Sequence, residues 1–144
     1  MKRWVAATFA AVALGAAGAS AAPGDTVLTG TTAEGTKVKL TVASFGNATA
    51  FKIGPTEATC DVGRLEIEAA KFNRFDTSDP GAFSDKRKSK VKDGRYLLRD
   101  TFKISGHLTS DEPSWTGTYD KTTKVFEKGQ RVDTCVVSTT WEVQ

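Results

Sequence analysis

Apolar and polar residues alternate along most of the chain after residue 36, and this period of two predicts β-strands with one buried face. The alternation is seen in the segments 36–42 (TKVKLTV), 64–68 (RLEIE), 101–108 (TFKISGHL), 114–119 (SWTGTY) and 135–143 (CVVSTTWEV). In TFKISGHL it places Phe102, Ile104 and Leu108 on one face and His107 on the other. In the last segment, Cys135, Val137, Thr139, Trp141 and Val143 share a face, so we expect that strand at the centre of the core.

Turn signals separate these segments at hairpin spacing, among them Asp93-Gly94 and Lys128-Gly129. Only residues 64–75 (RLEIEAAKFNRF) also allow helical spacing, and the neighbouring strands and phenylalanines favour a strand there. Residues 23–144 are therefore predicted to form one all-β domain, an antiparallel β-sandwich, with a closed β-barrel as the alternative.

Residues 1–22 have the pattern of a cleavable signal peptide, which is expected to be helical. Lys2 and Arg3 precede an apolar stretch over residues 4–14, and Ala19-Ser20-Ala21 fits a cleavage site. The apolar stretch is short for a membrane span, although a retained anchor is the alternative. We expect a secreted or periplasmic protein with no transmembrane segment after cleavage.

Export alters the charge balance of the chain. The full sequence has 20 Lys and Arg against 17 Asp and Glu, and losing Lys2 and Arg3 leaves 18 − 17 = +1 from side chains. A nucleic-acid binder usually carries a large basic surplus. Binding to any polyanion therefore requires local clustering of positive charge.

Cys60 and Cys135 are the only two cysteines. In an oxidising compartment an even pair predicts one disulfide, which here closes a loop of 75 residues. Two cysteines and one histidine do not complete a four-ligand zinc site.

The sequence lacks the usual residue sets of catalysis. His107 is the only histidine, and no G-x-S-x-G motif, phosphate-binding loop or calcium loop is present. The acidic residues are scattered, with charged or turn neighbours, and spacing on strands does not show which of them converge; they include Asp61, Glu66, Asp100, Asp111 and Asp120. We expect no enzyme activity, no cofactor and no metal.

A basic run stands out at residues 86–92, with Lys86, Arg87, Lys88, Lys90 and Lys92. It precedes the Asp93-Gly94 turn, and its lysines suit an edge strand, where they discourage aggregation between sheets. The alternative is a polyanion-binding site for an acidic cell-wall polymer, lipid head groups or nucleic acid. Nucleic acid is the least expected of these, because no aromatic residues interleave the basic ones.

Two similar segments, 77–83 (TSDPGAF) and 109–115 (TSDEPSW), both run from Thr-Ser-Asp through Pro to an aromatic residue. Shared turn chemistry explains the similarity. The alternative is a pair of loops that insert into the cleft of a secreted hydrolase as an inhibitor.

The second half of the chain resembles a pattern found in small secreted proteins of high-GC bacteria. The matching motifs are Asp93-Gly94, Ile104-Ser105-Gly106, Gly117-Thr118-Tyr119, and Cys135 with Trp141, together with the earlier Cys60. The resemblance covers roughly residues 51–143 and implies a secreted, single-disulfide β-sandwich. That family is uncharacterised, so the resemblance brings no catalytic residue.

These observations predict a secreted, non-catalytic binding module of the cell exterior or envelope, with an unidentified ligand. The alternatives are a polyanion-binding protein that uses residues 86–92, an inhibitor of secreted hydrolases and, last, a hydrolase that uses carboxylates.

Overall fold

The protein is described by a computed structural model that covers residues 2–4, 24–75, 80–109 and 114–144. These residues form eleven strands and no helix. The strands are β1 (Lys2–Trp4), β2 (Thr26–Thr32), β3 (Lys37–Val42), β4 (Ala48–Ile53), β5 (Thr56–Cys60), β6 (Gly63–Ile67), β7 (Ala70–Asn73), β8 (Ala82–Asp93), β9 (Tyr96–Leu108), β10 (Trp115–Glu127) and β11 (Gln130–Val143).

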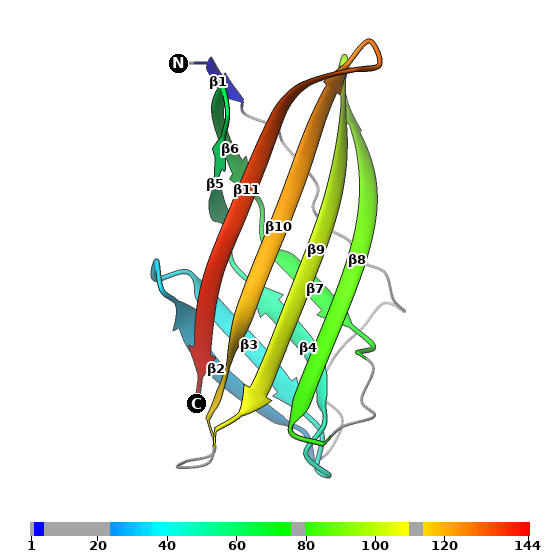
Figure 1. Cartoon of the computed structure of the whole chain (residues 1–144). Helices are drawn as coiled ribbons and strands as arrows, with labels where there is room; N and C mark the ends of the chain where they lie inside the picture. Colours follow the sequence, from blue (N-terminus) through cyan, green and yellow to red (C-terminus); the bar gives the residue numbers. More distant parts are fainter. Residues whose placement is uncertain (1, 5–23, 76–79, 110–113) are drawn as a thin grey trace.

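Strands β8 to β11 are 12 to 14 residues long and make a continuous antiparallel meander (Figure 1). Two tight turns connect its hairpins, at the positions that the sequence predicts. In the β10–β11 turn, Lys128 and Gly129 both have positive φ angles, of 50° and 78°. This is the conformation of a type I′ turn, one of the two turn types favoured in two-residue hairpins. We call β8–β11 the long sheet.

Strand β11 has two partners along its other edge. Cys135 and Val136 pair with β5, whereas Trp141 to Val143 pair with β2. From β2 the sheet continues through β3 and β4 to β7, and from β5 it continues through β6 to β1. The all-β prediction is confirmed, and the two predicted layers are parts of one curled sheet, a half-barrel, in which β2–β3–β4–β7 lies behind the long sheet (Figure 1).

The core lies between these two layers. Phe51 and Phe72 from the short strands pack against Tyr119 and Phe102 of the long sheet, with ring centroids 5.4 to 6.3 Å apart. All four side chains are at most 1% exposed. The predicted inward face of 135–143 is confirmed, because its five residues are all buried.

Trp141 occupies a space made by two glycines of the long sheet. A Cβ at Gly106 would lie 2.6 Å from the indole, and one at Gly117 would lie 2.5 Å from it. The indole Nε1 donates a hydrogen bond to the Thr118 carbonyl oxygen at 3.2 Å. The two glycines are therefore needed for close approach of the ring, and the buried ring satisfies its single donor.

The predicted disulfide joins Cys60 of β5 to Cys135 of β11. The two residues face each other in the ladder, with Cα atoms 3.9 Å apart. The bond thus attaches the β5–β6 hairpin to the middle of the molecule.

Residues 64–75 contain β6 and β7, so the strand interpretation of that stretch is confirmed. Leu108, predicted on the inner face, lies at the end of β9 and is 47% exposed. Most of the predicted signal peptide, residue 1 and residues 5–22, falls outside the described residues, while Lys2–Trp4 pairs with β6 in parallel. Over the described part of the chain, no helix has the length and apolar character to cross a membrane.

Candidate anion-binding face

Strand β8 separates its side chains into two sets. Lys86, Lys88, Lys90 and Lys92 are exposed on the outer face, and the residues between them, Arg87 among them, are half-buried on the inner face. Because β8 pairs only with β9, it is an edge of the long sheet. The predicted edge position is confirmed, and the four lysines of this strand are exposed.

The next two strands add positive charge beside these lysines. Lys90 faces Arg99 of β9, and Arg99 faces Lys124 of β10, which puts three cations in one row across three strands. Lys103 of β9 faces Lys86 in the same way. Neighbouring strands are about 4.8 Å apart, so these charged groups are close neighbours. We call the seven residues the cationic face: Lys86, Lys88, Lys90, Lys92, Arg99, Lys103 and Lys124.

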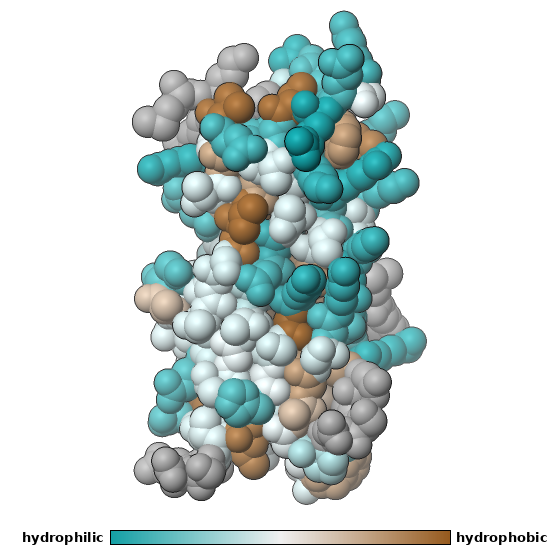
Figure 2. All heavy atoms as spheres, viewed as in Figure 1, coloured by the Kyte–Doolittle hydropathy of each residue, from teal (hydrophilic) through white to brown (hydrophobic). Residues whose placement is uncertain are grey.

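Figure 2 views the outer side of the long sheet, on which hydrophilic residues gather over β8 and β9. Towards β10 and β11 the surface changes to residues of intermediate hydropathy, which in the sequence are mainly Thr and Ser. The face is therefore cationic along one edge and rich in hydroxyl groups beside it.

The cationic face has little compensating negative charge. On the outer sides of β8, β9 and β10, Asp120 is the only carboxylate, and its Oδ1 accepts a hydrogen bond from Ser138 at 2.6 Å. Asp120 faces Lys103 in the ladder, but no ion pair joins them. Among the described residues, none of the seven cations takes part in an ion pair.

A hollow of about 580 Å³ opens on this face. The Arg99 guanidinium lies over the Phe126 ring, 4.9 Å from its centroid, and Thr101 and Thr122 contribute hydroxyl groups. Lys88, Lys90 and Lys124 supply ammonium groups, and Ser89 and the buried Asp100, which is paired with Lys121, also line the hollow. Ammonium, guanidinium and hydroxyl groups all donate hydrogen bonds to anionic oxygens, so the hollow suits phosphate, sulfate or carboxylate groups.

Beneath the cationic face lies a buried ion pair. Lys121 Nζ is 3.7 Å from Asp100 Oδ1, with the two side chains 1% and 0% exposed. Thr123 donates to the same oxygen at 2.5 Å, and Ser89 donates to Oδ2 at 3.3 Å. Burial lowers the pKa of Lys121, and the Asp100 carboxylate offsets part of that effect. The pair is neutral overall and leaves the charge of the outer face uncompensated.

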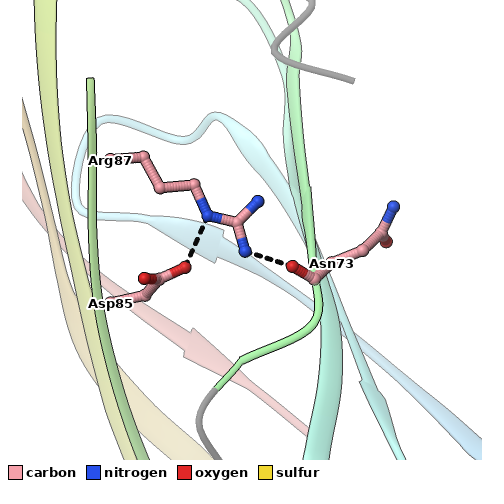
Figure 3. A network of polar contacts seen from close by, with 3 residues as sticks. All are labelled: Asn73, Asp85 and Arg87. Carbon is pink, nitrogen blue, oxygen red and sulfur yellow. Dashed lines mark hydrogen bonds and ion pairs between the residues drawn. The ribbon is translucent and has the colours of Figure 1, made fainter. Parts of the chain in front are cut away.

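Arg87 belongs to the interior and not to the cationic face (Figure 3). Its Nε donates to Asp85 Oδ2 at 2.6 Å, and its Nη2 donates to the Asn73 carbonyl oxygen of β7. Its guanidinium carbon also lies 5.7 and 5.9 Å from the ring centroids of Phe72 and Phe75. The side chain thus links two edge strands of the curled sheet, β8 and β7.

The structure therefore divides the predicted basic site between the two faces of β8. Four of its five residues share the outer face, and Arg87 lies on the opposite side of the strand. Sequence reasoning missed Arg99, Lys103 and Lys124, although strand alternation in 96–108 and 115–127 places all three outward. What the sequence does not show is the register that aligns them with the lysines of β8.

The other sequence candidates form no site among the described residues, or they lie outside them. His107 is exposed, as predicted. In the described part of the chain, one trio has metal-ligand spacing, Cys60, Asp133 and Cys135, but its two sulfurs are bonded to each other. Half of the two segments considered for an inhibitor, 77–83 and 109–115, lies outside the described residues, namely residues 77–79 and 110–113.

The cationic face is thus a concentration of positive charge on one side of the molecule, and its function is inferred from its residues and their arrangement. The resemblance to small secreted bacterial proteins stays a prediction. Comparison with known protein families, with curated proteins and with solved structures finds no match for this chain.

Proposed function

We propose that this protein is a secreted, non-catalytic binding module, and that its cationic face binds a linear acidic polymer of the cell exterior. The observation that carries the proposal is the row Lys90–Arg99–Lys124, which crosses three adjacent strands without a carboxylate. Like charges directly opposite each other destabilise a sheet. A ligand with repeated negative charges removes that repulsion when it binds.

Protection of a sheet edge accounts for only part of this arrangement. It explains lysines on β8, because β8 has an open edge. It does not explain Arg99, Lys103 and Lys124, because β9 and β10 are paired on both sides and have no edge to protect. The extension of positive charge into the interior of the sheet therefore favours a ligand.

The spacing of the lysines favours an extended polymer. Side chains on one face of a strand repeat about every 6.8 Å, so the four lysines of β8 form a straight line of charges. Hydroxyl groups beside them suit the hydroxyl groups and oxyanions of an acidic carbohydrate or sugar-phosphate polymer. Nucleic acid is less well served, because Phe126 is the only aromatic residue that lines the hollow and Arg99 covers its ring.

A pair of charge-matched variants tests the proposal. The variant Lys90→Ser/Lys124→Ser removes both ends of the cation row. The control Arg64→Ser/Lys128→Asn removes the same charge from β6 and from the β10–β11 turn. Retention on heparin and on dextran sulfate is measured against salt. The first variant should bind roughly tenfold or more weakly than the wild type, since each lysine near an anionic surface contributes about 1 kcal/mol.

The control should elute close to the wild type. Equal elution of the two variants would mean that only net charge matters, and the cationic face would be excluded as a site. Tighter retention on duplex DNA than on dextran sulfate, at equal salt, would overturn the choice of an acidic carbohydrate polymer.

A further inference from the structure

The short strands carry a second row of cations. Lys39 of β3 faces Lys52 of β4, and Lys52 faces Lys71 of β7, so three lysines lie side by side across three strands. Lys39 and Lys52 are exposed and Lys71 is half-buried. Lys37, also exposed, lies two residues before Lys39 on β3. We call these four lysines the second cationic face.

This face is as poorly compensated as the first. Strands β3, β4 and β7 contain no acidic residue, and none of the four lysines forms an ion pair among the described residues. A hollow of about 420 Å³ is lined by all four lysines and by small residues such as Gly54 and Ala69. Shallow walls of this kind leave the ammonium groups accessible to a ligand from outside.

The two cationic faces point away from each other. Lys52 alternates with Phe51, whose ring packs inward against Tyr119, and Tyr119 belongs to the long sheet. The residues of the first face likewise alternate with inward residues such as Asp100 and Lys121. The core therefore separates the faces, and one polymer segment lying flat on the long sheet leaves the second face free (Figure 1).

We propose that the second cationic face binds a second segment of the same acidic polymer, so that one protein molecule bridges two chains. This inference rests on the proposed function of the first face. Two sites on one rigid body hold two chains at a fixed distance, and the network as a whole then dissociates much more slowly than either contact.

A sandwich assay measures bridging directly. Heparin-coated beads are incubated with the protein and then with soluble fluorescent heparin, and captured fluorescence is compared with the amount of bound protein. The variants are Lys39→Ser/Lys52→Ser, Lys90→Ser/Lys124→Ser and the control Arg64→Ser/Lys128→Asn. Each removes two positive charges. Light scattering in the same buffer gives the oligomeric state.

The wild type and the control should capture fluorescent heparin. The Lys39→Ser/Lys52→Ser variant should bind the beads but capture at least about fivefold less soluble heparin per bound molecule. If this variant captures as much soluble heparin per bound molecule as the wild type, the inference is overturned. The same holds if light scattering shows a dimer that bridges two heparin chains through two copies of the first face. Wild-type protein that binds the beads without capture would overturn it as well. No binding of the wild type to the beads would instead overturn the proposed function.

Discussion

The inner and outer faces of the long sheet both carry charged side chains, but within the described part of the chain only those on the inner face form ion pairs. Inside, each cation has an anion: Arg87 contacts Asp85, and Lys121 contacts Asp100. Outside, over β8, β9 and β10, the seven residues of the cationic face share the surface with one carboxylate, Asp120, and none of the seven forms an ion pair among the described residues. Burial requires a partner for each charge, whereas water tolerates unpaired charges at low cost. The inner charges therefore serve the fold, and the outer ones are left available for a ligand.

The largest expected effect comes from breaking the inner pair. Asp100→Asn leaves Lys121 buried without its counter-charge and should cost roughly 3–5 kcal/mol of unfolding free energy. Urea denaturation measures this loss. Adding Lys121→Met should restore most of it, because the buried charge is then gone. A loss below about 1 kcal/mol for the single variant would show that the pair is not a structural requirement.

A smaller and pH-dependent effect is expected at Tyr119, on the same inner face. Its hydroxyl is buried without a hydrogen-bond partner, and burial together with the Asp100 charge raises its pKa above the ordinary value of 10.0. Above pH 10 the unfolded chain releases this proton first. The unfolding free energy should therefore fall as pH rises, by up to about 1.4 kcal/mol per pH unit.

Tyr119→Phe should flatten that alkaline decline and leave stability at pH 7 equal or slightly higher. The lowered pKa of Lys121 makes the unfolding free energy rise with pH, which is the opposite trend. Because Lys121 is present in both the wild type and the Tyr119→Phe variant, its contribution is the same in the two proteins. The difference between the two stability curves from pH 8 to pH 11 therefore isolates Tyr119. Parallel curves would contradict the assignment.

The smallest effect on stability is expected outside. Lys90→Ser/Lys124→Ser should change the unfolding free energy by no more than about 0.5 kcal/mol, because both side chains are exposed and lack ionic partners. Added salt should stabilise the wild type more than this variant, because salt screens the repulsion within the row. A loss of several kcal/mol would mean that these lysines support the fold.

Much of this architecture follows from local pattern. Alternation identifies the strands, Asp93-Gly94 marks a hairpin, and the pair of cysteines predicts the disulfide that the structure contains. Lys121 also sits on the apolar side of its strand, between Tyr119 and Thr123, which is a sequence signal for a buried lysine that reasoning from charge alone overlooks.

The rest depends on contacts between distant segments. The partners of β11 change along its length, and this change joins two expected layers into one curled sheet. The alignment of Lys90 with Arg99 and Lys124 depends on the register of three strands, which no single strand encodes. Composition gives a net charge near zero for the chain without its predicted signal peptide, and it does not show how unevenly the charge is distributed.

The two glycines around Trp141 restrict how this sequence can diverge. The atoms nearest to a Cβ at Gly106 belong to the rings of Phe83 and Trp141, each 2.6 Å away, so a larger residue there requires both rings to move or to become smaller. A Cβ at Gly117 would lie 1.9 Å from the carbonyl oxygen of Ser105, and no change of a neighbouring side chain removes a backbone atom. A larger residue at 106 therefore requires compensating changes at both 83 and 141, whereas no side-chain change makes room for a larger residue at 117.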